Sequence, residues 1–414
     1  MMHSKITPAT RASVWIWLPN ETSPVVAGLI EKQKNSHVFT YGRSYREREN
    51  AISLSPFELP LKSGTFEPTG INTIHSCLRD AAPDAWGRRV IYQEFSHFHP
   101  DELDFMLLSG SNRIGALDFQ ESNSEYIPRL ANTVNLSDIM CAAELVEKGS
   151  PLPHHLGLAL LRGTSIGGAR PKCLLEDKSK HLIAKFPLHS DIYDIIKAEY
   201  IAMKLAGLVS INVAKVNMLS VMKKEILLIE RFDRSSVMKG TARHLLLSGL
   251  SLLGLNELEA RYASYCDLAD IIRQRFYDPK QDLIELYKRL VFNILIGNTD
   301  DHARNHSAFW DGEHLRLTPA YDLCPQPRAG QEATQAMAIE GLQGNLSTLI
   351  NVLSVSEKFL LSKKEAKDLI NEQISIIQDN WIRVCDEASL PIVERQKLWE
   401  YSVFNPFCFY GWEK

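Results

Sequence analysis

A polar segment that directly follows an apolar helix constrains this chain more than any other feature. The segment is GNTDDHARNH at residues 297–306, and the preceding residues 286–296, LYKRLVFNILI, place apolar side chains on one helical face. A helix that buries such a face fixes the start of the following loop against the core. A further acidic residue, Asp322, follows Asn305 by seventeen positions. The spacing predicts an acidic site carried by a mainly helical part of the chain.

The side chains of this region suit phosphoryl transfer. Asn305 follows Asp300 by five residues, which is the spacing of the protein-kinase catalytic loop. In that loop the aspartate accepts the proton of the attacking hydroxyl, and the asparagine helps to bind Mg²⁺. Carboxylate and amide oxygens are ligands that Mg²⁺ accepts, so Asp322, after Pro319-Ala320-Tyr321, is a further candidate ligand. We predict Asp300 as the catalytic base and Asn305 and Asp322 as metal ligands.

A zinc or iron site is the rival interpretation of the same segment. Asp301, His302 and His306 are residue types that bind such metals. Two histidines four residues apart meet only on a helix, whereas Gly297-Asn298 favours a loop. We therefore expect His302 to support the loop, Asp301 to be partly solvated, and Arg304 to pair with one of the two aspartates.

A glycine turn between two predicted strands lies upstream of this region. The turn, TSIGGARPK at residues 164–172, offers backbone N–H groups and hydroxyls that can cradle phosphate, and a plain hairpin turn is the alternative. Lys185 lies in the apolar strand HLIAKFP, where an unpaired charge is costly. Glu199, fourteen residues later on a predicted helix at 194–208, is its candidate partner. The candidate nucleotide-binding residues here are Ser165, Gly167, Gly168, Lys172, Lys185 and Glu199.

The order of predicted elements indicates an α+β fold with two lobes. Runs rich in β-branched and aromatic residues at 13–18, 24–32 and 37–42 predict strands. The chain beyond about residue 240 is mainly helical in pattern, and 414 residues exceed one ordinary core. We predict three units: a β-rich, then helical, N-terminal subdomain at 1–130, a small lobe with the phosphate loop at 131–235, and a helical lobe at 236–414.

Composition bears on the partners and the compartment. The formal net charge is -4, which gives no overall attraction to nucleic acid or to an anionic membrane. The seven cysteines contain no C-x-x-C pair, so neither a disulfide framework nor a zinc site is expected, and a reducing cytoplasm fits. No secretory signal and no membrane-spanning stretch are predicted.

With these motifs assembled, the chain resembles the HipA family of toxin–antitoxin serine/threonine kinases over nearly its whole length. The segment RDAAPDAWGRR at 79–89 is similar to a recurring segment of the family's N-terminal part. The resemblance implies a two-lobed, protein-kinase-like fold and a site that uses ATP and Mg²⁺. It also implies that Lys185 binds ATP phosphates, that the backbone of Glu230 and Phe232 meets adenine, and that Glu199 supports Lys185.

The resemblance has further implications for regulation and partners. Ser165 would be the serine of the phosphate loop that becomes autophosphorylated, and its added negative charge would oppose ATP phosphates. A small DNA-binding, HipB-like antitoxin would be the partner, and DNA would be bound only indirectly through it. The substrate would be a protein, for which the family precedent is an aminoacyl-tRNA synthetase.

Three classes of function stay open from the sequence. The first is a serine/threonine protein kinase that acts as a toxin, and the second is a small-molecule or lipid-type kinase on the same scaffold. The third is a catalytically weak corepressor that acts with a DNA-binding antitoxin. The intact set Lys185, Asp300, Asn305 and Asp322 argues against the third class, because a degenerate site would have lost part of it.

Overall fold

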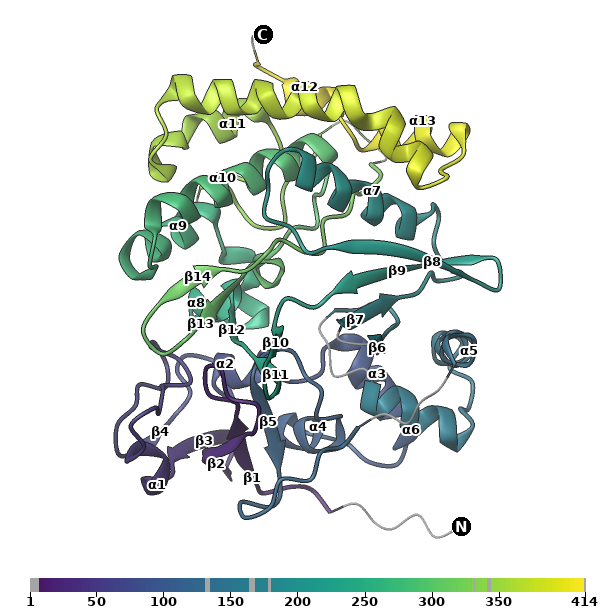
Figure 1. Cartoon of the computed structure of the whole chain (residues 1–414). Coiled ribbons are helices and arrows are strands. Elements are labelled where there is room, and N and C mark those ends of the chain that lie inside the picture. Colours follow the sequence, from purple (N-terminus) through teal and green to yellow (C-terminus); the bar gives the residue numbers. More distant parts are fainter. Residues whose placement is uncertain are drawn as a thin grey trace.

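The computed structural model describes residues 7–130, 135–163, 168–177, 180–328, 330, 332–340 and 344–412. The chain is arranged in tiers, with a β-rich N-terminal part at one end and a helical part at the other (Figure 1). A four-stranded sheet and the helix α7 lie between them (Figure 1). The predicted α+β class is therefore confirmed.

The N-terminal sheet is antiparallel, with the strand order β4-β3-β2-β1-β5. Its strands are β1 (Arg11–Ile16), β2 (Val25–Gln33), β3 (Ser36–Tyr41), β4 (Thr65–Phe66) and β5 (Leu117–Gln120). The first three coincide with the predicted runs of β-branched and aromatic residues. Four short helices accompany this sheet: α1 (Arg43–Arg46), α2 (Ser76–Arg79), α3 (Ala85–Glu94) and α4 (Glu102–Leu108).

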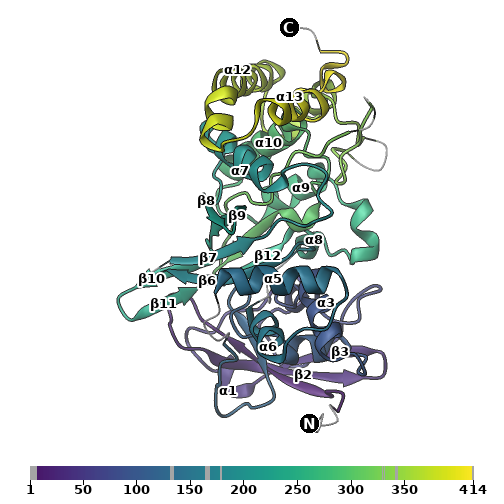
Figure 2. The same cartoon turned by 90° about the vertical axis from the view of Figure 1, so that its right-hand side faces the viewer.

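Helices α3, α5 (Leu136–Glu147) and α6 (His154–Gly163) lie together beside the central sheet (Figure 2). They share an apolar cluster with the sheet, in which Trp86 and Val146 pack with Phe186. The segment before the glycine turn, expected as a strand, is the second half of α6 instead. Leucine is a strong helix former, and Leu160 and Leu161 bury their side chains in this cluster, so packing and propensity both favour the helix.

The central sheet has the strand order β6-β7-β9-β8 and is antiparallel throughout. Its strands are β6 (Lys172–Asp177), β7 (Lys180–Lys185), β8 (Val216–Val221) and β9 (Lys224–Glu230). The register pairs Lys172 with Lys185, and Lys185 also pairs with Leu227. Helix α7 (Ile195–Leu208) packs against β8 and β9. Two lysines therefore stand side by side at one end of the sheet, close to a helix.

The rest of the chain forms a hairpin, a small sheet and the helical part. The strands are β10 (Arg234–Val237), β11 (Gly240–Arg243), β12 (Leu245–Ser248), β13 (Ser307–Trp310) and β14 (Leu315–Leu317). The α-helices are α8 (Gly249–Leu252), α9 (Tyr265–Arg275), α10 (Pro279–Ile296), α11 (Leu349–Ser354), α12 (Lys363–Glu387) and α13 (Ile392–Tyr401). The 3₁₀ turns are η1 (Glu257–Tyr262), η2 (Ala303–Asn305), η3 (Ser356–Phe359) and η4 (Pro406–Phe409).

Helix α10 connects this framework to the predicted acidic loop. Asp278 caps its start with a 3.1 Å bond from Gln281 N–H, and Pro279 occupies the first helical position. The helix ends at Gly297, whose φ of 71° is in the left-handed region that favours glycine. Its apolar face is fully buried, so the loop begins at a fixed point.

Two further predictions concern cysteines and membranes. All seven cysteines are free thiols, and Cys141 alone among them is exposed. Within the described ranges, no helix combines the length and the apolar character needed to cross a lipid bilayer.

A buried ionic cluster joins the N-terminal part to the segment after β9. The Asp233 carboxylate accepts hydrogen bonds from Arg231 at 2.7 Å, from Arg234 at 2.8 Å and from Gly115 N–H at 2.7 Å. Both arginines also donate to the Arg113 carbonyl, at 2.6 and 2.5 Å. All three charged side chains are buried, so this segment belongs to the interior of the protein.

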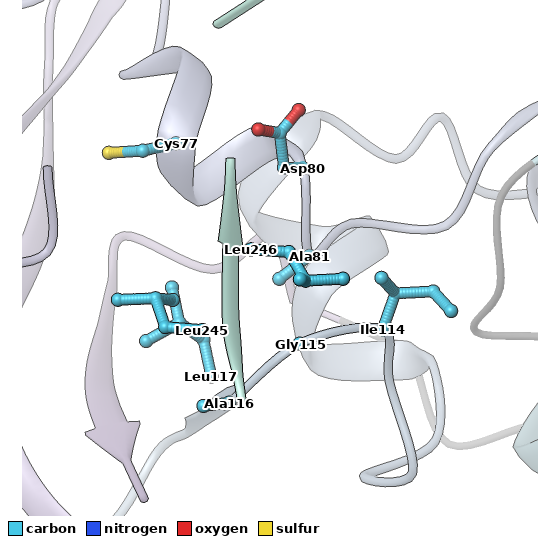
Figure 3. A pocket seen from close by; sticks show the side chains of 9 residues that line it. All are labelled: Cys77, Asp80, Ala81, Ile114, Gly115, Ala116, Leu117, Leu245 and Leu246. Carbon is cyan, nitrogen blue, oxygen red and sulfur yellow. The ribbon is translucent and has the colours of Figure 1, made fainter. Parts of the chain in front are cut away.

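A small cavity of about 10 Å³ lies near the same junction (Figure 3). It is lined by residues of the N-terminal part and of β12, namely Cys77, Asp80, Ala81, Ile114, Gly115, Ala116, Leu117, Leu245 and Leu246. Its volume suits about one water molecule. The junction is therefore well packed, and this cavity cannot accept a nucleotide.

The Asp233→Asn substitution is expected to destabilise the protein by about 3–5 kcal/mol, because it leaves two buried guanidinium groups without their anion. Denaturant unfolding measures the change. The matched control is Asp368→Asn on the exposed face of α12, which makes no such contacts and should leave the unfolding midpoint at the parent value. Equal midpoints for both variants would show that the cluster contributes nothing.

Candidate active site

The Lys185 ammonium lies between two carboxylates that come from distant parts of the chain. Lys185 ends β7 and is 6% exposed. Its Nζ is 2.5 Å from Glu199 Oε1 on α7 and 2.5 Å from Asp322 Oδ1, which follows β14. A buried ammonium requires such partners, because its desolvation is costly. The predicted pairing with Glu199 is present, and Asp322 joins it as a second anion.

The three charges shift one another's pKa values. Lys185 holds the pKa of Asp322 well below its usual range. Burial disfavours the charged form of Lys185, but Asp322 and Glu199 outweigh it and raise the pKa of the ammonium. Burial raises the pKa of Glu199, and Lys185 opposes this shift. Lys185 and Asp322 thus remain charged at neutral pH, and the Asp322 side chain stays 44% exposed.

Asp322 has an unusual backbone conformation. Its φ is 59°, in the left-handed region that a non-glycine residue adopts at a cost. The neighbouring Tyr321 hydroxyl donates to the Arg304 carbonyl at 2.7 Å and lies 2.6 Å from Ser307 Oγ. These bonds connect the Asp322 segment to the predicted catalytic loop and hold the strained backbone of Asp322 in place.

The predicted catalytic loop separates an exposed aspartate from a buried one. Asp300 is exposed, and its carboxylate makes no hydrogen bond or ion pair within the described parts of the chain. Asp301 is 1% exposed and accepts hydrogen bonds from Tyr265 Oη and, at 2.9 Å, from His306 Nε2. Asn293 donates to the same tyrosine hydroxyl at 3.1 Å. The expectation of a partly solvated Asp301 is therefore wrong, since this residue anchors the loop to α9 and α10.

The neighbourhood of Asp300 makes it a better proton acceptor. Partial burial raises the pKa of its carboxyl, His302 opposes the shift, and Asp322 and Asp301 add to it. An aspartate with a free carboxylate and a raised pKa suits general-base chemistry. Arg304 pairs elsewhere, with Asp80, Asp84 and Glu257. The expected pairing of Arg304 with Asp300 or Asp301 is absent.

Asn305 and Asp322, the predicted metal ligands, carry oxygen atoms of the type that hard divalent cations accept. Within the described residues, no group of three or more His, Cys, Asp and Glu side chains could hold a metal ion. Asn305 and Asp322 offer an amide and a carboxylate. Mg²⁺ is commonly bound by one or two protein oxygen ligands together with substrate phosphates and water.

The end of the predicted phosphate loop lies beside Lys172. Ser165 and Gly167 fall outside the described residues, whereas Gly168 is described and has a φ of 104°. A Cβ at Gly168 would lie 2.2 Å from Lys172 Nζ, so the lysine approaches the loop backbone closely. Lys172 is 5% exposed, and burial together with Lys185 lowers its pKa to about 8. Two neighbouring lysines create a site that favours an anion.

Aromatic side chains border the segment predicted to meet adenine. Phe232 is half-buried, and its ring centroid lies 5.6 Å from that of Tyr321 and 6.0 Å from that of Phe309. Its backbone N–H and C=O make no hydrogen bond to any described residue. Glu230 ends β9 and its carboxylate pairs with Lys180 at 3.5 Å. The free backbone of Phe232 is suited to a ligand edge.

The sequence left several supporting residues unassigned. Tyr265 reaches Asp301 across 36 positions, and Tyr321 reaches Arg304 across 17. Nothing in local spacing signals such contacts. Asp84 was visible only within the segment RDAAPDAWGRR, without a role.

The arrangement of a sheet and a helical part around the Lys185–Glu199 pair is that of a protein-kinase-like fold. Two family models agree with this class: the HipA N-terminal domain matches residues 16–120, and the HipA-like C-terminal domain matches residues 164–381. The second alone covers more than half of the chain. The chain therefore belongs to the HipA family.

Individual relatives are distant. Protein Y4mE of Sinorhizobium fredii is 29% identical over 309 residues, which is 69% of this chain and 71% of that protein. The serine/threonine-protein kinase toxin HipA of Shewanella oneidensis is 27% identical over 190 residues, 38% of this chain and 42% of the relative. A solved complex of HipA, HipB and operator DNA from Shewanella oneidensis MR-1 has 17% identity and a TM-score of 0.70, over 96% of this chain and 97% of that one. This likeness shows the shared fold.

The Gly297→Ala substitution is expected to disrupt the start of the acidic loop. A Cβ at Gly297 would lie 2.4 Å from the Ser402 carbonyl oxygen of the C-terminal segment, in addition to the left-handed φ of 71°. The matched control is Gly70→Ala, whose φ is 63° but whose Cβ would meet nothing within 4 Å. Backbone strain should lower the free energy of unfolding of both variants by about 1–2 kcal/mol. Overpacking should lower that of Gly297→Ala by about a further 1–3 kcal/mol. Equal unfolding midpoints would contradict the proposed contact.

Proposed function

We propose that this protein is an ATP- and Mg²⁺-dependent serine/threonine protein kinase and the toxin of a HipA-type toxin–antitoxin system. The observation that supports the proposal most strongly is the Lys185 ammonium between Glu199 and Asp322. Membership of the HipA family supports a kinase, and kinases use ATP.

Each residue has a role that follows from its surroundings. Lys185 and Lys172 bind the phosphates of ATP. Backbone groups of Phe232 and Glu230 form hydrogen bonds with the edge of the adenine ring, which lies against the aromatic ring of Phe232. Asp300 takes the proton of the acceptor hydroxyl. The oxygen of that hydroxyl bonds to the γ-phosphorus as the bond between this phosphorus and ADP breaks, and ADP leaves. Bound Mg²⁺ would neutralise charge that develops on the phosphates, and Asn305 and Asp322 would hold it.

The phosphate loop gives a route to self-inhibition. We propose Ser165, near Gly167 and Gly168, as an autophosphorylation site. Its phosphate would add about -1.5 to -2 charge next to the sites of the ATP phosphates. The two anions would compete for Lys172 and Lys185, so the modified protein would bind ATP poorly.

The proposal extends to the division of the chain and to its partners. An accessory N-terminal subdomain spans 1–130, a small lobe spans 131–235 and the helical lobe spans 236–414. The complex that shares this fold contains HipB and operator DNA. We propose a HipB-like antitoxin as the partner here, DNA contact only through that antitoxin, and a protein substrate, for which an aminoacyl-tRNA synthetase is the first candidate.

Phosphate mapping tests the proposed function. The purified protein is incubated with Mg²⁺ and ATP, and phosphate is located by intact and peptide mass spectrometry. The parent should carry phosphate on Ser165. Asp300→Asn removes the base with little change of shape, and should slow the modification by about 100-fold or more. Asp368→Asn on α12 should behave as the parent.

Other outcomes of this mapping are equally informative. Phosphate elsewhere in the parent would contradict the assignment of Ser165 but keep the kinase. An unmodified parent that binds ATP and modifies no protein in a cell extract would contradict the protein-kinase proposal. A small-molecule kinase or a corepressor would then replace it.

A further inference from the structure

Asp84 begins helix α3 but does not cap it. An aspartate at this position ordinarily accepts hydrogen bonds from the first N–H groups of its own helix. Here the Asp84 side chain makes no such bond. Its Oδ2 instead accepts the Gly168 N–H at 2.7 Å, and its Oδ1 lies 3.7 Å from Arg304 Nη1. The Asp84 side chain binds two distant partners and does not cap the N-terminus of α3, which indicates that it has a function outside this helix.

The first partner, Gly168, is the described end of the phosphate loop. Its carbonyl accepts the Trp86 N–H at 3.3 Å, so Asp84 and Trp86 hold both polar groups of this glycine. The glycine has a φ of 104°, and Lys172 Nζ occupies the space where a Cβ would stand. The N-terminal segment therefore sets how the loop backbone meets the lysine.

The second partner, Arg304, lies inside the catalytic loop directly before Asn305. Its carbonyl is bonded to the Tyr321 hydroxyl, next to Asp322. Its guanidinium forms an ion pair with Glu257 and lies 3.9 Å from Asp80 as well as 3.7 Å from Asp84. These carboxylates outweigh burial and raise the pKa of Arg304, so it stays charged.

We propose that Asp84 is a positioning residue that ties the phosphate loop to the catalytic loop, one carboxylate oxygen to each. The N-terminal part then helps to position the loops of the nucleotide site. The proposal rests on the proposed phosphotransferase function and adds to it. ATP phosphates must lie between the two loops, and a displacement of about 1 Å between reacting groups can cost about 100-fold in rate.

Amide hydrogen exchange tests the hydrogen bond from Gly168 to Asp84, and it does not require catalysis. Overlapping peptides that isolate Gly168 report how well its N–H is protected. Asp84→Ala removes the acceptor and should speed exchange at Gly168 by about tenfold or more. Asp84→Asn keeps an oxygen acceptor and should preserve most of the protection. Asp138→Asn, an exposed position on α5, is the control and should match the parent. Unchanged exchange in Asp84→Ala would overturn the proposal.

Steady-state kinetics of phosphate transfer test the contact between Asp84 and Arg304. Asp84→Asn and Arg304→Gln each break the charged contact between the loops, and each should lower kcat by about 10- to 100-fold. The double variant should be no worse than Arg304→Gln alone, because that change already removes the contact with Asp84. The unfolding midpoint is measured alongside. Additive losses, or losses that follow the midpoint, would show a merely structural role.

Failure of the proposed kinase activity and failure of the Asp84 contact give different results. A parent that transfers no phosphate to any acceptor refutes the proposed function. Gly168 exchange then still decides whether Asp84 holds the loop.

Discussion

The Lys185 ammonium, placed between Glu199 and Asp322, is the interaction on which this structure depends. It joins three separate pieces of the fold: strand β7, helix α7 and the segment after β14. Lys185 thus brings two carboxylates from distant parts of the chain together, and Asp322 is the more exposed of the two.

The N-terminal part supports this arrangement rather than standing apart from it. The buried cluster around Asp233 connects it to the segment after β9, and Ser248 donates two hydrogen bonds to Asp80, at 2.7 and 2.8 Å. Asp80 and Asp84 of this part also lie 3.9 and 3.7 Å from Arg304 Nη1 in the catalytic loop. A change in the N-terminal part can thus reach the site through polar contacts of short range, with no large motion required.

Local sequence signals predicted much of the architecture and, at the candidate site, the pairing of Lys185 with Glu199. Three of the five strands of the N-terminal sheet, β1 to β3, follow from their β-branched and aromatic composition, and α10 with its terminal glycine follows from its apolar face. Lys185, Glu199 and Asp322 could be grouped because spacing and residue type match the needs of phosphoryl transfer. The helix α6 was missed, since apolar leucines before a glycine turn fit a strand as well as a helix until their packing partners are known.

The remaining errors share one cause. Whether Asp301 is solvated, and which carboxylates meet Arg304, depends on residues that lie far away in the chain, such as Tyr265 and Glu257. Charged residues in a polar loop look exposed in a sequence. Long-range packing decides otherwise, as it does for Asp233.

Calorimetric titration with a non-hydrolysable ATP analogue, with and without Mg²⁺, tests the central claim most directly. The Lys185→Met variant is compared with Lys180→Met, which makes the same change at a side chain 57% exposed on the same strand. Lys185→Met is expected to weaken Mg²⁺-dependent binding by about tenfold or more, which corresponds to about 1.4 kcal/mol, while Lys180→Met binds as the parent does. Equal affinities in all three proteins would contradict the assignment of Lys185 to the phosphates, and with it the proposed site.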